Sequence, residues 1–238
     1  MRLAFDFHFH SCLSPCGDMA MTPATVAGLC RLAGLDAAAL TDHNTCGNCP
    51  AFCAAAQAYG LLPLPGMELC TLEEVHVICL FPSLDQAMAF QDLVYRRLGD
   101  RINAPGIFGR QVRMDVEDNP IGDEPRLLSG ATDIPIYEVR ELVEGFGGVA
   151  YPAHIDRDSF SLLSNLGLWD PALGFPLAEV SRRCPPDLFC IRRDLRGVPS
   201  VMGSDAHYLD QIQDAHQWME VPSRSPEAVL AWMRRGGM

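Results

Sequence analysis

The sequence has few basic residues and no long apolar segment, and both absences narrow the range of functions. It contains 18 Lys and Arg residues against 30 Asp and Glu residues, which gives a formal net charge of −12. Proteins hold nucleic-acid backbones with clusters of basic side chains, so we expect no surface for a long nucleic acid. No apolar stretch approaches the roughly 20 residues that span a bilayer, so we expect no membrane partner.

A leader segment and an interdomain linker are also missing from the pattern. The apolar run after Met1 leaves no room for a signal peptide, and we therefore expect a cytoplasmic protein. No Ser/Gly-rich or Pro-rich linker divides the 238 residues, so a single domain over residues 1–238 is expected. The sequence contains neither a Gly-rich phosphate loop nor an internal repeat.

The ten cysteines are present without an export signal, which favours reduced thiols over a disulfide framework. Cys46, Cys49 and Cys53 are closely spaced, and Cys12 and Cys16 lie on another loop. Such groups can bind zinc or an iron–sulfur cluster, or exchange disulfides. Because other cysteines are scattered along the chain, we interpret these as ordinary thiols and keep a metal or redox sensor as an alternative.

Apolar runs alternate with helical patterns along most of the chain, which favours a parallel sheet or barrel. Residues 100–135 interrupt this order with turn residues between two short extended runs, and we expect a hairpin-like excursion at the pocket mouth. The seven expected strands lie near residues 3–10, 37–41, 62–66, 75–80, 147–152, 177–180 and 198–203. Helices are expected at 24–33, 50–59, 84–98, 136–145 and 225–235.

Candidate metal ligands recur at the ends of the expected strands. His8 and His10 are two residues apart on a strand, so both imidazoles leave the same face. The carboxyl ends of parallel strands joined by helices lie on one rim, where enzymes gather catalytic groups. The later candidates are Asp42, His43, Glu68, His76, His154, Asp205 and His207. Six of the seven histidines take part, and packing alone gives no reason for this distribution.

In this order the motifs resemble those of the polymerase and histidinol phosphatase (PHP) family of metal-dependent phosphoesterases. The resemblance implies a distorted seven-stranded β/α barrel of the TIM-like kind, which agrees with the strand count. It spans residues 3–207 and is carried by His8-Phe9-His10, Thr41-Asp42-His43-Asn44, Gly66-Met67-Glu68, His76, Pro152-Ala153-His154 and Gly203-Ser204-Asp205-Ala206-His207.

The resemblance implies a trinuclear site, in which two or three divalent ions are bound. Imidazole and carboxylate ligands together suit Zn, Mn or Fe. One ion would bind His8, His10, Glu68 and Asp205. Glu68 would bridge to a second ion on His76 and His154, and a third would bind His43, His207 and a loop residue. The loop departs from the family and offers Asp18 or Cys16; we expect Asp18, because Gly17 allows the turn that aims it.

The implied function is hydrolysis of a phosphoester in a small phosphorylated substrate, a phosphomonoester or a short nucleotide, by a metal-bound hydroxide. Catalytic roles fall to Glu68, Asp205, His207 and Arg157, and substrate-binding roles to Arg157, His43 and His207. Arg157 follows His154 by three residues and suits a phosphate; a surface ion pair with Asp156 or Asp158 is the alternative. The rival functions are a nuclease at oligonucleotide ends and the non-enzymatic sensor on the cysteine loops.

Overall fold

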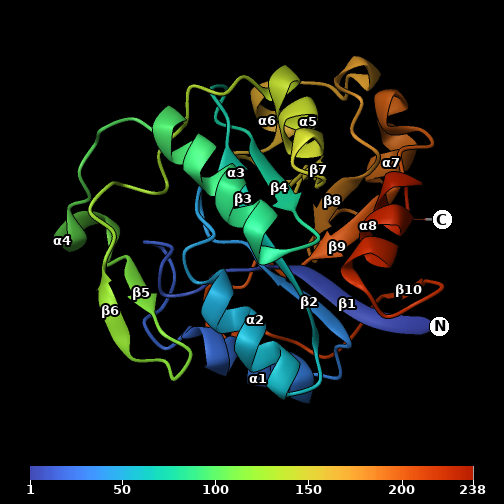
Figure 1. Ribbon diagram of the computed structural model, residues 1–238. Helices are drawn as coiled ribbons and strands as arrows, with labels where there is room; N and C mark the ends of the chain where they lie inside the picture. Colours follow the sequence, from blue (N-terminus) through green and yellow to red (C-terminus); the bar gives the residue numbers. More distant parts are fainter. Residues whose placement is uncertain (238) are drawn as a thin grey trace.

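The computed structural model describes residues 1–237 and has a mixed α/β fold built on a curled sheet (Figure 1). In spatial order, the main sheet contains β10 (Trp218–Glu220), β1 (Arg2–Phe9), β2 (Ala37–Leu40), β3 (Leu62–Cys70), β4 (His76–Leu80) and β7 (Val149–Pro152). Two further strands, β8 (Ala178–Ser181) and β9 (Ser200–Gly203), form a separate parallel pair. β10 at the edge was not expected from the sequence.

The β8–β9 pair is hydrogen-bonded to the main sheet at two places near one rim: β8 contacts the segment after β7, and the segment after β9 contacts the segment after β1. The backbone N–H of Ile155, after β7, donates to Glu179 O in β8 at 2.9 Å. The N–H of His10, after β1, donates to Ala206 O, after β9, at 3.0 Å. Apart from a separate two-stranded hairpin, the strands within residues 1–237 therefore form a six-stranded sheet and a linked pair, and not one hydrogen-bonded ring of seven.

The sheet is not wholly parallel, which corrects the expectation from the sequence. β1, β2 and β3 are parallel, but β4 is antiparallel to both β3 and β7. The connection from Cys70 to His76 is too short for a helical crossover, which a parallel neighbour would need. His76 is consequently the first residue of its strand, and it still lies at the edge where the other strands end.

Most of the long helices cover the outer face of the sheet, and the last one packs on the other side, with Phe5 and Phe7. The expected helices are confirmed within one or two residues. Ser83 caps α3 by accepting a hydrogen bond from Gln86 N, and Ser225 caps α8 in the same way from Ala228 N. The helices are α1 (Pro23–Leu32), α2 (Cys49–Ala58), α3 (Leu84–Arg97), α5 (Ile136–Gly145) and α8 (Pro226–Arg234), with the short α4 (Pro105–Phe108), α6 (Leu162–Asn165) and α7 (Leu188–Ile191). No described helix has the length and apolar character needed to cross a membrane.

A β-bulge in β1 brings the first two histidines to the interior of the curled sheet. Phe5 and Phe7 pack with Trp232 of α8, whereas Phe9 packs in the other core cluster, under the outer helices. The register with β2 shifts between Asp6 and Phe9, and such a shift reverses the alternation of side chains. His8 and His10 therefore face the same interior as the phenylalanines that precede them.

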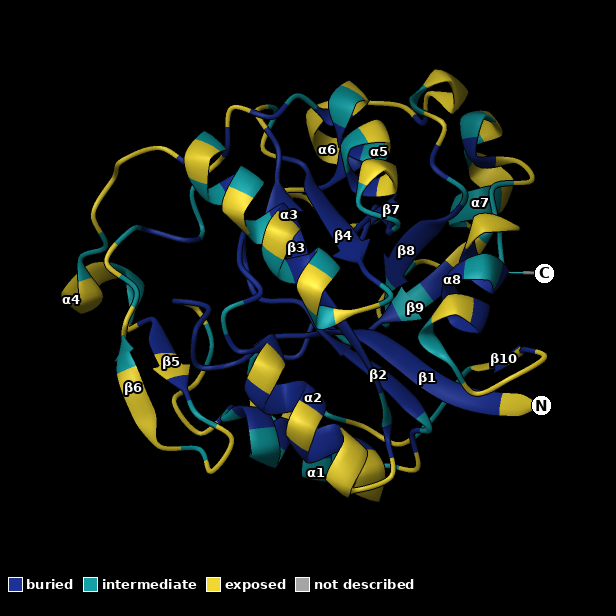
Figure 2. Cartoon of the chain, viewed as in Figure 1, coloured by how far each residue is buried: buried dark blue, intermediate teal, exposed yellow. Residues whose placement is uncertain are grey.

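The expected excursion is confirmed as an antiparallel hairpin of β5 (Val112–Met114) and β6 (Pro120–Asp123). It packs beside the loop after β1, where Val112 N donates to Cys12 O at 2.9 Å. β6 is largely exposed, in contrast to the central strands β1 to β4 and to β7 of the main sheet (Figure 2). Of the whole segment, Ser129 lines the cavity described below.

Candidate metal centre

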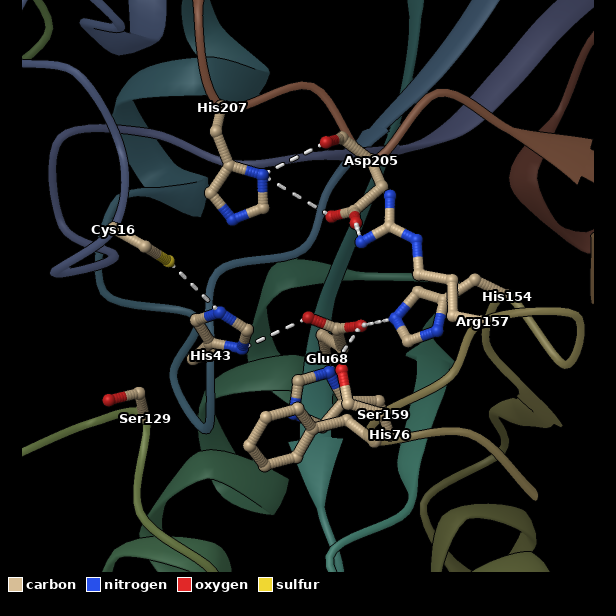
Figure 3. Close-up of a pocket in the computed structure, with 11 residues that line it drawn as sticks. Cys16, His43, Glu68, His76, Ser129, His154, Arg157, Ser159, Asp205 and His207 are labelled. Carbon is tan, nitrogen blue, oxygen red and sulfur yellow. Dashed lines mark hydrogen bonds and ion pairs between the residues drawn. The ribbon is translucent and has the colours of Figure 1, made fainter. Parts of the chain in front are cut away.

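Eight ligand-type side chains converge at one end of the curled sheet, and Figure 3 shows the six of them that line the cavity there. The side chain of His207 is 18% exposed, and the other seven residues are buried. His8 and His10 end β1, and the others are His43 after β2, Glu68 in β3, His76 at the start of β4, His154 after β7, and Asp205 and His207 after β9. The predicted ligands from distant parts of the chain are thus brought together, apart from the loop ligand.

Glu68 lies at the centre of this group. Its two carboxylate oxygens lie 2.9–3.3 Å from ring nitrogens of His8, His10, His43, His76 and His154. Asp205 approaches the same site, with Oδ1 3.2 Å from His8 Nε2 and 3.0 Å from His10 Nε2. Two carboxylates among so many imidazoles provide the donor set that Zn²⁺, Mn²⁺ and Fe²⁺ prefer.

The hydrogen bonds around His8 and His10 leave a place for a cation between the two rings. His8 Nδ1 lies 2.7 Å from Glu179 Oε1, which can only accept, so the ring proton resides on Nδ1. Ser14 Oγ donates to Asp42 Oδ1 at 2.7 Å and therefore accepts from His10 Nδ1 at 2.8 Å. The two Nε2 atoms face each other at 3.2 Å, each with a lone pair, an arrangement that a shared cation stabilises.

Unpartnered polar atoms support the same assignment. Glu68 Oε2, Asp205 Oδ1 and His43 Nδ1 are buried and make no hydrogen bond of regular geometry, although Glu68 Oε2 and His43 Nδ1 lie only 3.0 Å apart. Buried polar atoms are rarely left in this state unless an ion or water satisfies them. Three groups bring one atom from each member within 4.8 Å of the others: His8, His10, Glu68 and Asp205; His43, Glu68 and His76; and His10, His43 and His207.

The charges of the site reinforce the need for a cation. Burial lowers the pKa of His8, but the negative charges of Glu179, Asp205 and Glu68 outweigh burial and raise it well above 6.5. Burial raises the pKa of Glu68, yet His76 and His8 outweigh it and hold this pKa well below its usual range. A proton thus takes the place of an ion when no ion is bound.

The structure reveals Glu179 in β8 as a site residue that the sequence analysis missed. Besides His8, Glu179 Oε1 accepts from the backbone N–H of His154 at 3.2 Å. A Cβ at Gly203 would lie 2.3 Å from the Glu179 carboxyl carbon, so any larger residue here would displace the Glu179 carboxylate. The only sequence signal was an acidic residue inside the apolar run from Leu177 to Val180.

The loop after β1 presents Cys16, and not Asp18, to the ligand group. Cys16 Sγ lies 3.2 Å from His43 Nε2. Asp18 is exposed and its Oδ1 accepts from Ala20 N at 2.8 Å, closing a local turn. The loop does turn at Gly17, whose N–H donates to Ser14 O. The side chain that points toward His43 is that of Cys16, and not that of Asp18.

Backbone strain is concentrated at the same end of the sheet. His154 and Asp205 have φ values of +27° and +49°, in the region that L-residues with a Cβ rarely adopt. Asn44, next to His43, has φ +52°, and its side-chain amide donates to Leu128 O at 2.6 Å. Such conformations persist where surrounding contacts hold them, and they are common at functional sites.

Arg157 lies at the mouth of the site, as the sequence predicts. Its Nη1 lies 2.5 Å from Asp205 Oδ2, and its side chain is 43% exposed. Asp156, one of the two alternative partners, instead accepts hydrogen bonds from Ser181 N and Oγ. A cavity of about 300 Å³ opens between Arg157, Glu68, His43 and Phe160.

The remaining cysteines and His216 lie outside the ligand group. Cys46 and Cys49 are buried, and both thiols donate to Gly66 O. Burial and the neighbouring Cys49 raise the pKa of Cys46 well above its usual value. In the described part of the chain, none of the three close groups of ligand-type side chains contains Cys46, Cys49 or Cys53. His216 is half-buried beside Arg182.

Comparison with known proteins agrees with this geometry. The PHP domain family model matches residues 6–101, a segment that includes five of the eight ligand-type residues. The match confirms that the chain resembles the PHP family, as its motifs predicted. No curated protein sequence matches the chain significantly.

Solved structures of similar fold include the lesion-specific endonuclease Q of Pyrococcus furiosus, with a TM-score of 0.72 and 18% identity over 98% of this chain and 56% of that one. Endonuclease Q in complex with a 27-mer duplex containing an abasic lesion gives 0.73 and 18%, over 98% and 57%. A protein provisionally named a metal-dependent phosphoesterase, from Bifidobacterium adolescentis, gives 0.59 and 19%, over 85% and 87%. The chain thus spans a little more than half the length of the endonuclease Q chains.

Proposed function

We propose that the chain is a metal-dependent hydrolase that cleaves a phosphoester in a small phosphorylated substrate, either a monoester or a short nucleotide. The observation that carries the proposal is the close approach of His8 Nε2 and His10 Nε2 beside Glu68 and Asp205. This arrangement is stable when a divalent cation lies within it. In this proposal residues 1–238 form a single PHP-type domain, with strands β1–β4 and β7–β9 as a distorted seven-stranded barrel.

We assign the ligands of two or three Zn, Mn or Fe ions from the same contacts. His8, His10, Glu68 and Asp205 hold the first ion, and they form one of the close groups of the structure. The remaining ligands are Glu68, His76 and His154 for a second ion, and His43, His207 and Cys16 for a third. Cys16 replaces Asp18 in this assignment because of its position next to His43.

When bound, closely spaced divalent ions lower the pKa of a coordinated water and neutralise phosphoryl oxygens. Glu68 and Asp205 supply the negative charge that holds them, and Glu179 and Ser14 fix the orientation of His8 and His10. Arg157 is placed to bind a phosphoryl oxygen, because its guanidinium already contacts a carboxylate at the cavity mouth. His43 and His207 line the same cavity, and we assign them to substrate binding as well.

Elemental analysis combined with a phosphate-release screen tests this function. Protein purified under mild conditions should carry two or three divalent ions per chain and release phosphate from at least one nucleotide or sugar phosphate when Mn²⁺ is added. Less than one ion per chain, with no uptake of Mn²⁺, Zn²⁺ or Fe²⁺, would overturn the proposal.

A nuclease acting on oligonucleotide ends is the second candidate, favoured by a neighbouring cavity. This cavity of about 590 Å³ shares Arg157 and Asp205 with the metal centre and is also lined by Arg182 and Arg183. Arg182 Nε is buried without a hydrogen-bond partner, and a phosphodiester oxygen would satisfy it. Cleavage of short single strands with a steep dependence on salt would identify this activity.

A further inference from the structure

The loop after β7 holds an apolar ring at the edge of the metal-centre cavity, and the proposed chemistry does not use it. Phe160 is 41% exposed and lines the cavity together with Arg157 and His76. Metal binding and phosphoester hydrolysis depend on charged and polar groups. A large, partly exposed aromatic ring at this position therefore needs a separate explanation.

The backbone holds Phe160 in an unfavourable conformation. Its φ is +52°, a left-handed value that is a genuine outlier for a bulky residue. Two hydrogen bonds fix the segment: His76 N donates to Phe160 O at 2.9 Å, and Ser161 Oγ donates to Arg157 O at 2.6 Å. The contacts that impose this conformation also determine where the ring lies, as at other strained functional positions.

The Phe160 ring is covered only in part. The ring stacks on His76 with a centroid distance of 4.8 Å and an interplanar angle of 24°. Within residues 1–237, no other aromatic ring lies against it. Since the side chain is partly exposed and lines the cavity, part of its surface is available to a ligand there.

We propose that Phe160 stacks on a planar ring of the substrate, so that the substrate is a nucleotide and not a sugar phosphate. The inference rests on the proposed function and narrows its substrate. Arg157 and Phe160 lie three residues apart on one loop, so the same loop would hold the phosphate and the base. Nucleic-acid bases stack on aromatic side chains irrespective of their sequence, because every base has a π face.

Two substrates that share the scissile bond test the proposal directly: a nucleoside 5′-monophosphate and ribose 5-phosphate, both with Mn²⁺-loaded protein. Phe160→Leu should lower kcat/KM for the nucleotide by about 5- to 150-fold, the usual effect of losing a stacked ring. The same variant should change kcat/KM for ribose 5-phosphate by less than about twofold, and Phe160→Trp should restore kcat/KM for the nucleotide. Tyr59→Leu, which removes an exposed ring on another face, is the matched control and should change neither rate.

Calorimetric binding of adenosine, which has no phosphate, gives a readout that does not require hydrolysis. Wild-type protein should bind adenosine, and Phe160→Leu should weaken this binding by at least about fivefold. Equal losses for both substrates with reduced metal content would show that the ring merely supports His76, and would overturn the proposal. Unchanged adenosine affinity would overturn it as well. If neither substrate is hydrolysed, the proposed function fails while adenosine binding still decides the role of Phe160.

Discussion

The two ends of the sheet interior differ in nearly every physical property. At one end, buried carboxylates and imidazoles crowd together, unpartnered atoms remain, and backbone strain is concentrated. At the other end, α8 closes the interior with apolar side chains: Phe5 stacks on Phe7 at 4.9 Å and meets Trp232 edge-on at 5.4 Å. Strand β1 contributes to both ends, with the β-bulge between them.

The difference shows how one interior can combine stability with a site that costs stability. Apolar burial is favourable without any partner, whereas buried charges need compensating charges or ions. We therefore expect changes at the apolar end to act on folding and changes at the polar end to act on metal binding and catalysis.

The largest effect is expected at the apolar end. Phe5→Ala removes a ring that is 2% exposed and should lower the free energy of unfolding by about 3–5 kcal/mol. Urea denaturation of the metal-loaded protein measures this change. Phe5→Ala protein that is fully folded should keep the wild-type metal content. If it is fully folded and still loses ions, the two ends of the interior are coupled.

At the polar end, Glu68→Gln keeps the shape of the side chain and removes its charge. We expect a rate loss of at least about a hundredfold, comparable to removing a major electrostatic element of an active site. Elemental analysis should show fewer ions, and the circular dichroism spectrum should be unchanged. Glu117→Gln on an exposed loop is the matched control. Near-wild-type activity of Glu68→Gln would place the chemistry elsewhere.

Arg157→Ala tests the mouth of the site and should have a smaller effect. The guanidinium is partly exposed and would contact the phosphate in both ground and transition states, so KM should rise by about tenfold with little change in kcat. Metal content should remain unchanged, because Arg157 is not among the ligands. A constant KM would mean that Arg157 serves only its ion pair with Asp205.

Much of the site was predictable because its residues follow strands in a fixed order. The positions of His8, His10, His43, His154 and Asp205 depend only on where strands end, and the apolar runs locate those ends. The antiparallel direction of β4 could not be read from His76 and its neighbours, since an apolar run does not encode strand direction. The existence of the expected helices was likewise clear from their apolar periodicity.

Features that depend on contacts between distant segments were missed. Glu179 acts through His8, which is 171 positions away, and no local pattern distinguishes it from an ordinary strand residue. The choice between Asp18 and Cys16 depended on the path of a short loop, where a shift of one or two residues decides which side chain points inward. Composition and spacing contain little information about such loop geometry.

The smallest effect on catalysis is expected at Cys16, which supplies one ligand to one ion in our assignment. Cys16→Ser should reduce activity only a few-fold and lower the affinity for zinc, because thiolate is the softer ligand. The reactivity of Cys16 can be compared with that of the buried Cys46. Burial raises the pKa of the Cys46 thiol and keeps this thiol protonated.

Burial raises the pKa of the Cys16 thiol, but His43 and His207 outweigh burial and lower it to about 5. A thiol with a lowered pKa is deprotonated above that value, so iodoacetamide should modify metal-free protein at an almost constant rate from pH 6.5 to 8.5. The rate should fall as the pH drops through 5. The experiment uses a Cys190→Ser background, which removes the other exposed cysteine, and mass spectrometry locates the label. Added Zn²⁺ should protect Cys16; unchanged labelling in saturating Zn²⁺ would remove Cys16 from the ligands and leave the His8, His10, Glu68 and Asp205 site intact.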